Sequence, residues 1–362
     1  MDQVIANLFA LLRQLKPLPH VLQADLTGKV VVVTGANTGL GFEAAKHFAQ
    51  MNPKKVILAC RSEEKGEQAV QKIVRTGYMR AEVWPLDLSS FDSVQAFADR
   101  FEKEGGGRLD ILVENAAVAP LESYQKTKDG YMTTVQVNAL ASSFHSLLML
   151  PHMIRTAEEH PETSPRIVFV SSGLHESSTL STDISKEILA QSNFIDALSS
   201  LEYFNQMWVF HNDPDPAVHT DNSSVLNIFF ARALQTRLSK FCPIVVNSVD
   251  PGYCISDLRR SIVSGPRGWL FWLMDRLVAY SSEEGSRSLI HAALAGNKAT
   301  IGASENETKY KGVYLSTQKI ATVSKFARSE AGLRLQETFW NDMVQIASER
   351  DERVARFVKT YL

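Results

Sequence analysis

The chain has 362 residues, of which 44% are hydrophobic, and its 38 basic and 40 acidic side chains leave a formal net charge of −2 at pH 7. A chain of this length and hydrophobic content can bury a sizeable core, which excludes an intrinsically disordered protein. The two signs of charge are interspersed, so composition gives no case for nucleic acid or an anionic membrane as a partner. We therefore expect a small-molecule substrate.

Residues 1–26 form a predicted N-terminal extension with the apolar spacing of an amphipathic helix. Arg13, Lys16 and two prolines interrupt this pattern, which is too short and too broken to cross a bilayer. We expect the extension to pack on the rest of the protein, and a membrane-surface anchor is the alternative. Residues 27–362 are expected to form a single domain.

From residue 29 onward, short β-branched runs alternate with amphipathic helical stretches. This order is typical of an α/β fold of the Rossmann type, a doubly wound parallel sheet of about seven strands with helices on both faces. The predicted strands span 30–34, 56–60, 81–86, 109–113, 166–171, 244–249 and 312–316, the last at an edge of the sheet. The predicted helices span 41–51, 63–76, 90–104, 124–152, 221–239, 282–295 and 330–350.

The first turn of this pattern carries a glycine-rich loop. Thr34-Gly-Ala-Asn-Thr-Gly-Leu-Gly41 follows an apolar strand and opens a helix, so its glycines allow a tight turn and the helix N-terminus faces an anion. The spacing predicts a site for the pyrophosphate of a dinucleotide. Its predicted contacts are Gly35, Asn37, Thr38, Gly39, Leu40 and Gly41.

Two residues that follow the second and third predicted strands are candidates to contact the adenosine end of the dinucleotide. Arg61 directly follows the second strand, where no acidic residue stands, and a guanidinium suits a 2′-phosphate. NADP(H) is therefore favoured over NAD, and a solvated surface arginine is the alternative. Asp87, after the third strand, either caps the next helix or binds the adenine amino group.

Two long segments, at about 173–220 and 256–281, interrupt the regular order after strands, on the side where open α/β sheets bind ligands. Both are rich in aromatic residues, which makes them candidate substrate loops, with ordinary core packing as the alternative. For His175, a loop histidine close to the end of the fifth strand, the alternative is a residue without a chemical role. The candidate substrate residues are His175, Tyr203, Trp208, Tyr253, Trp269 and Trp272.

Taken together, these motifs resemble the short-chain dehydrogenase/reductase family from about Thr27 to the C-terminus. The glycine loop, Leu86-Asp87-Leu88 and Glu114-Asn115-Ala116-Ala117 match its cofactor segments, the last in place of Asn-Asn-Ala-Gly. Asn138 and Ser172 match its catalytic asparagine and serine, and Pro251-Gly252 its segment beside the nicotinamide. The resemblance thus implies cofactor contacts at Asp87, Leu88, Asn115, Ala116, Pro251 and Gly252. The C-terminal segments resemble a long subgroup common among fungal enzymes of specialised metabolism.

The resemblance also implies a tyrosine and, one helical turn later, a lysine that lowers the pKa of the phenol. Thr220 and Ser224 stand at these positions, and the match of Val225 to Phe230 with the family leaves little freedom to shift the register. A threonine hydroxyl without a neighbouring cation cannot supply the same proton donor. His219 is a candidate substitute, although its neighbouring position turns it about 100° away.

We therefore prefer an enzyme that converts a mostly apolar metabolite by a non-redox cyclisation, isomerisation or dehydration. In this hypothesis Ser172 polarises a substrate oxygen and Asn138 holds a water molecule or backbone. An NADPH-dependent reductase with a substitute proton donor is the first alternative, a cofactor-binding pseudoenzyme the second, and a deliberate replacement of the tyrosine and lysine the third.

The scattered Cys60, Cys242 and Cys254 favour a reducing, cytoplasmic location and no bound metal. A homodimer is one open oligomeric state, because family dimers associate through helix faces that periodicity does not identify.

Overall fold

The computed structural model describes residues 14, 17–118, 123–178, 180, 193–203, 217–238, 243–255, 275–302 and 306–362, without the side chains of 177 and 217–221. Most of the predicted N-terminal extension and of the predicted substrate loop at 256–281 lies outside the described residues. The division into an extension and a single domain stays a prediction.

The described residues form one eight-stranded sheet in the order β3-β2-β1-β4-β5-β6-β7-β8. All pairs are parallel except β7 with β8, so the predicted doubly wound α/β fold is confirmed. The strand order reverses next to β1, between the loops that follow β1 and β4, which is where such sheets bind ligands. The strands are β1 Val30–Thr34, β2 Lys55–Cys60, β3 Ala81–Pro85, β4 Ile111–Glu114, β5 Arg166–Val170, β6 Val245–Asp250, β7 Tyr314–Ser316 and β8 Lys319–Ala321.

The expectation that 312–316 forms an edge strand is wrong, because β8 pairs with β7 on its outer side. The two strands are joined by Thr317 and Gln318, whose φ values are +47° and +67°. Two consecutive residues with positive φ make the tight turn that suits an antiparallel hairpin. Glycine, asparagine and aspartate usually mark this turn, and none of them is present.

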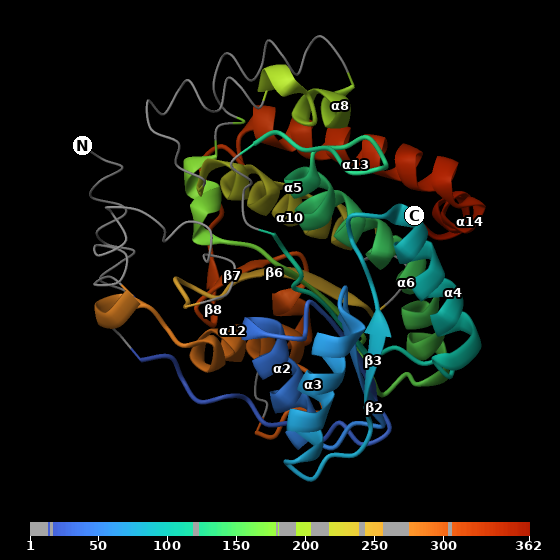
Figure 1. The fold of residues 1–362 in the computed structure, drawn as a ribbon, viewed down its shortest axis with the longest axis vertical. Helices are drawn as coiled ribbons and strands as arrows, with labels where there is room; N and C mark the ends of the chain where they lie inside the picture. The colour runs from blue at the N-terminus through green and yellow to red at the C-terminus, as the bar shows by residue number, and fades with distance from the viewer. Residues whose placement is uncertain are drawn as a thin grey trace.

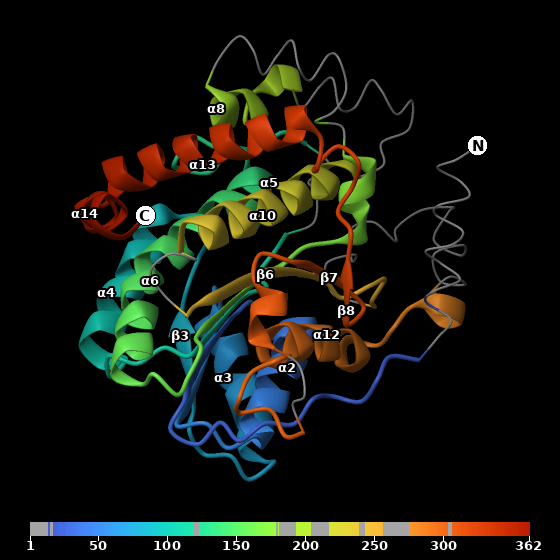
Figure 2. The ribbon, with the colours of Figure 1, turned by 180° about the vertical axis from the view of Figure 1, so that it is seen from behind.

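Helices cover both faces of the sheet (Figures 1 and 2). One face carries α2 Gly39–Gln50, α3 Glu63–Val74 and α12 Ser282–Leu294, and the other carries α4 Phe91–Glu104, α6 Ala141–Glu159 and α10 Ala217–Leu238. Helix α13, Glu330–Arg350, lies outside α10, and α14, Glu352–Tyr361, follows it. Short helices α8 Phe194–Leu198, η2 Gly173–Ser177 and η5 Glu307–Tyr310 lie in the connections.

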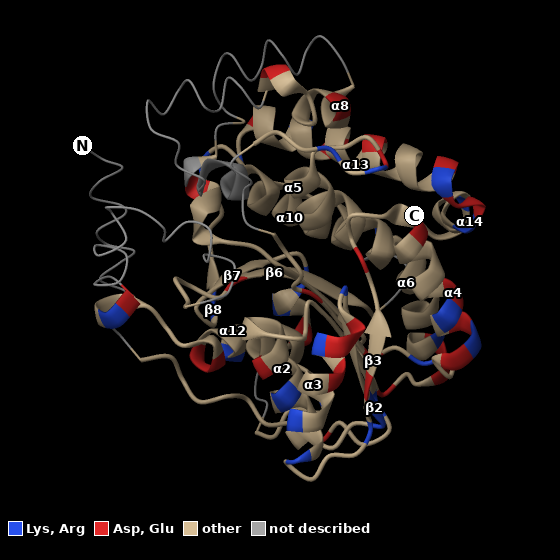
Figure 3. Ribbon diagram, in the orientation of Figure 1, with Lys and Arg blue, Asp and Glu red and all other residues tan. Residues whose placement is uncertain are grey.

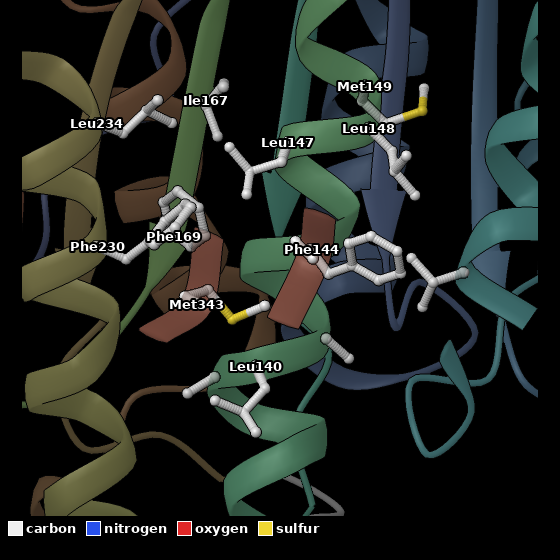
Figure 4. Close-up of a cluster of buried hydrophobic side chains, with 14 of the residues drawn as sticks. Leu140, Phe144, Leu147, Leu148, Met149, Ile167, Phe169, Phe230, Leu234 and Met343 are labelled. Carbon is white, nitrogen blue, oxygen red and sulfur yellow. The ribbon is translucent and has the colours of Figure 1, made fainter. Parts of the chain in front are cut away.

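Buried aromatic side chains join β5, α10 and α13 into one core (Figure 4). The rings of Phe169 and Phe230 meet edge to face with centroids 5.5 Å apart, and Phe230 stacks on Trp340 at 5.4 Å. The guanidinium of Arg237 lies 4.4 Å from the Trp340 ring. This packing fixes α10, the helix that carries Thr220 and Ser224, against the sheet.

The helix expected at 124–152 begins later and ends later. It starts with α5, Thr133–Val135, passes through a π-helical turn, η1 Gln136–Leu140, and continues as α6 to Glu159. The preceding segment turns at Gly130, whose φ is +93°, so it cannot continue the helix backward. A π turn inside an α-helix often marks a functional site.

Charged residues of both signs lie side by side on the outer helices, as on α4 and α14 (Figure 3). This mixed surface agrees with the interspersed charges of the sequence. No helix among the described residues is long and apolar enough to cross a membrane.

Candidate functional site

The loop between β1 and α2 folds tightly against the residues that follow β4. Gly35 has φ +65°, and a Cβ atom there would lie 2.9 Å from the Cα of Ala116. A Cβ on Gly41 would lie 2.6 Å from the carbonyl oxygen of Gly35. Gly39 has φ +59° and nothing within 4 Å of its Cβ position. The loop therefore requires glycine at three places and is open at Gly39.

Helix α2 starts at this open place without the acidic residues that begin its neighbours. Its N-cap, Thr38, is exposed and makes no side-chain capping hydrogen bond, and no acidic residue stands in the first turn. In α3, α4, α12 and α13, by contrast, a serine caps the helix and an acidic residue follows. The positive end of α2, between the half-buried Asn37 and Leu40, thus fits a ligand pyrophosphate.

Asn115 ties the loop to the end of β4. Its Nδ2 donates to the carbonyl oxygen of Thr34 at 2.8 Å, while Thr34 Oγ1 accepts from the backbone N–H groups of Asn115 at 2.9 Å and Ala116 at 3.0 Å. Two neighbouring strand ends are thereby held in one geometry beneath the open face of the loop.

On the adenosine side, Arg61 is exposed immediately after β2. The carboxylate of Asp87 accepts hydrogen bonds from the backbone N–H of Ser89 at 2.9 Å and its hydroxyl at 2.7 Å. Ser90 caps α4, so the helix-capping interpretation of Asp87 is wrong. Leu88 is 4% exposed, and its side chain belongs to the core.

The π turn holds Asn138 with its amide toward the loop after β4. Asn138 Oδ1 accepts from the backbone N–H of Val118 at 2.8 Å, and its Nδ2 donates to the carbonyl oxygen of Val118 at 3.1 Å. The same Nδ2 lies 3.5 Å from Ser223 Oγ on α10. Of the two roles expected for Asn138, this geometry favours holding backbone.

Ser172 is half-buried at the carboxyl end of β5, and its Oγ accepts from the backbone N–H of Leu174 at 3.2 Å. The preceding Ser171 donates from its Oγ to the carbonyl oxygen of Ser224 at 3.0 Å. Asn227 Nδ2 donates to the carbonyl oxygen of Val170 at 3.0 Å. These contacts place position 224 beside Ser171, at the strand end where Ser172 stands.

Five of the predicted site residues have side chains outside the described atoms. His219 and Thr220 belong to α10 by their backbone, and their side chains are outside the described atoms. Trp208, Trp269 and Trp272 lie outside the described residues. Their predicted roles stay predictions.

Two predicted substrate residues are buried. His175 is 1% exposed, with Nδ1 2.9 Å from the carbonyl oxygen of Ser172 and Nε2 accepting from the N–H of Ser324 at 3.1 Å. Tyr203 is 2% exposed, and its hydroxyl accepts from Asn222 Nδ2 at 2.7 Å. Both environments favour a structural role over substrate contact.

The last residue of β6, Asp250, adds a carboxylate to which the sequence analysis assigned no role. Asp250 Oδ1 accepts from the N–H of Gly252 at 2.9 Å, and Oδ2 accepts from Ser316 Oγ at 3.0 Å. A Cβ on Gly173 would lie 3.3 Å from Asp250 Oδ2, so this carboxylate stands beside the residue that follows Ser172. Burial, and then the charge of Asp250, raises the pKa of the Tyr314 phenol well above its usual value. The aspartate directly before Pro251 was the available sequence signal.

The residues that follow β6 pack against the segment that precedes α12. Gly252 has φ +85°, and a Cβ there would meet Tyr280 at 3.1 Å. The hydroxyl of Tyr253 donates to Asp275 Oδ1 at 2.9 Å. Within the described part of the chain, no three histidine, cysteine, aspartate or glutamate side chains gather as a metal-binding group.

Comparison with known proteins decides the family. A sequence model of the short chain dehydrogenase family matches residues 29–181. The short chain dehydrogenase/reductase dmxR8 of Cryptosporiopsis sp. (strain 8999) is 32% identical over 335 residues, which cover 91% of this chain and 93% of that protein. The chain belongs to the short-chain dehydrogenase/reductase family.

Other members of this family agree with the assignment. The short chain dehydrogenase sol3 of Alternaria solani is 34% identical over 77% of this chain and 88% of its own. Among solved structures, salutaridine reductase from Papaver somniferum superposes with a TM-score of 0.57 at 22% identity, covering 80% of this chain and 99% of its own. This structural likeness shows the fold.

Proposed function

We propose that this short-chain dehydrogenase/reductase binds NADP(H) and converts a small, mostly apolar metabolite without net hydride transfer, by cyclisation, isomerisation or dehydration. The observation that carries the proposal is the register of α10. Ser171 donates to the carbonyl oxygen of Ser224 at the end of β5, and Ser224 is the residue that the resemblance aligns with the family lysine. With Thr220 one turn earlier, neither a phenol nor its cationic neighbour is supplied from the family positions.

The loop after β1 supports the dinucleotide part of the proposal. The glycines at 35, 39 and 41 and the uncharged first turn of α2 would hold the pyrophosphate, and Asn115 and Ala116 would line the loop beneath it. Exposed Arg61 would contact a 2′-phosphate. When bound, a nicotinamide can supply hydride, and in the proposed reaction it serves to shape the pocket.

The hydrogen bonding of Ser172 supports the proposed non-redox chemistry. Because its Oγ already accepts a hydrogen bond from the N–H of Leu174, its own hydrogen is directed elsewhere and can be donated to a substrate oxygen. Such a donor polarises a carbonyl or hydroxyl group, which assists enolisation, ring closure or loss of water. Asn138 would keep Val118 and α10 in place around that substrate.

A carbonyl reductase with a substitute proton donor is the second candidate. The names of similar proteins favour it, since dmxR8 and sol3 are both named short chain dehydrogenases. Fungal sources of these relatives also support a role in specialised metabolism, while a cytoplasmic location and a homodimer remain part of the proposal.

The test uses purified protein with a panel of apolar ketones, enols and tertiary alcohols, each with and without NADPH deuterated at its transferable position. We expect products that are isomers of the substrate, or lighter by one water, and that carry no deuterium. Deuterium in the product together with stoichiometric NADPH oxidation would establish the reductase and refute the proposal. Loss of product in Ser172→Ala, with NADPH affinity unchanged, would separate catalysis from binding alone.

A further inference from the structure

A buried carboxylate and a buried imidazole lie directly beneath the dinucleotide loop. Glu114 is the last residue of β4, and His145 stands in the second turn of α6. Both side chains are 0% exposed, and Glu114 Oε1 lies 2.7 Å from His145 Nδ1. The family's asparagine is expected at position 114, so a carboxylate here is a departure that needs a partner.

The surroundings show how this carboxylate is held. Ser146 Oγ donates to Glu114 Oε1 at 3.2 Å. Thr34 Oγ1 lies 3.3 Å from Glu114 Oε2 and 3.3 Å from the carbonyl oxygen of Val113, the two acceptors available to its single hydrogen. The ring of His145 meets Phe97 edge to face, with centroids 4.9 Å apart. Glu114 Oε1 and His145 Nδ1 thus share one short hydrogen bond within this buried site.

Thr34 connects the pair to the loop. Its hydroxyl is within 3.3 Å of Glu114 Oε2 and also accepts from the backbone N–H groups of Asn115 and Ala116. Those residues in turn press against Gly35, whose Cβ position is 2.9 Å from Ala116 Cα. A continuous chain of contacts therefore runs from α6 through β4 to the turn that would hold the pyrophosphate.

We infer that Glu114 and His145 act together as positioning residues, which hold Thr34 and the loop after β1 in the geometry that binds the dinucleotide. This inference rests on the proposed NADP(H) site. Within this buried network His145 is held through Nδ1, while its Nε2 is buried without a hydrogen-bond partner in the described residues, so its ring position depends on Glu114. Loss of either partner should therefore weaken dinucleotide binding beyond what a general loss of stability causes.

The test compares two buried carboxylates at opposite ends of β4. Asp110, just before the strand, accepts from the N–H of Val30 at 2.9 Å and from Arg108 at 2.8 Å, far from the loop. NADPH affinity is measured by titration calorimetry, and the unfolding midpoint by thermal denaturation, for wild type, E114Q, H145N, E114Q/H145N and the control D110N. All affinities are measured well below the unfolding midpoint of each variant.

We expect E114Q and H145N each to raise the Kd for NADPH about tenfold or more, and the double variant to add less than about twofold to the larger single effect. D110N should lower the unfolding midpoint with its Kd within about twofold of wild type. If E114Q does not fold, T34V, which removes the linking hydroxyl, carries the same expectation.

Three other outcomes would overturn the inference. Equal affinity in E114Q, H145N and D110N, with wild type binding NADPH, overturns the positioning role and leaves the proposed function standing. Independent, fully multiplying losses in the double variant also overturn it, because the two residues would not act as a pair. A wild-type protein that binds neither NADPH nor NADH overturns the inference together with the proposed cofactor site.

Discussion

The hydroxyl of Ser171 donates a hydrogen bond of 3.0 Å to the backbone carbonyl oxygen of Ser224, which brings α10 to the carboxyl end of β5. The side chain of residue 224 is therefore attached to the backbone close to the end of β5, and the resemblance to the family predicts a lysine at this position. If the fold around it is intact, restoring the missing groups should restore the missing chemistry.

The double variant T220Y/S224K should gain carbonyl reduction with NADPH by a factor of about 10²–10⁴ over the parent, because a phenol with an adjacent ammonium supplies general acid catalysis. Deuteride transfer from labelled NADPH into a panel of aromatic ketones measures the gain. The single variant S224K, which has the cation without the phenol, is the control. No gain in the double variant, with NADPH still bound, would contradict the proposed reading of these two positions.

Gly41→Ala should raise the Kd for NADPH at least about tenfold, a loss of ~1.4 kcal/mol of binding free energy. The added Cβ would lie 2.4 Å from Asn115 Nδ2 and 2.6 Å from the Gly35 carbonyl oxygen, so the loop must shift. Gly77→Ala is the matched control, since its site has φ +98° and nothing within 4 Å. That variant should lose ~1 kcal/mol of stability through backbone strain and keep its NADPH affinity.

Arg61→Ala should weaken NADPH binding about tenfold or more and leave NADH binding nearly unchanged, because a guanidinium contributes to the 2′-phosphate alone. Calorimetric titration with both dinucleotides gives the ratio of affinities. Arg75→Ala, which removes another exposed guanidinium after α3, serves as the control. Equal losses for NADPH and NADH would show that Arg61 does not read the 2′-phosphate.

His152 should make stability depend on pH below neutrality. Burial lowers the pKa of its imidazole below the ordinary value of 6.5, outweighing the nearby Glu102 carboxylate. The unfolded chain therefore binds a proton more readily, so stability is retained above about pH 6.5 and falls as the pH decreases through this window. Replacing His152 by Gln should flatten that dependence of the unfolding midpoint. Leu148→Ala, a non-titrating core truncation one turn earlier on α6, should lower the midpoint and keep the pH slope.

Local patterns explain why much of the fold was predictable. The central strands β1, β2, β4, β5 and β6 are short, mostly apolar runs rich in β-branched residues and almost fully buried, so each can be predicted from its own sequence. The hairpin of β7 and β8 was missed because Thr317 and Gln318 adopt positive φ without the residues that announce such a turn. The start of the helix expected at 124–152 was wrong because apolar residues such as Tyr131 and Met132 continue its pattern past the turn at Gly130.

The sequence by itself determined the family resemblance and the glycine loop, and it predicts that Thr220 and Ser224 replace the family's tyrosine and lysine, because each is a short pattern within one strand-turn-helix unit or one helix. Tertiary structure alone decided that His175 is enclosed between Ser172 and Ser324, that Glu114 meets His145, and that Asp250 stands beside Gly173. These contacts join residues from separate elements, and no local spacing encodes them. Burial and pairing are properties of the packed sheet and its helices, and they appear only when the chain has folded.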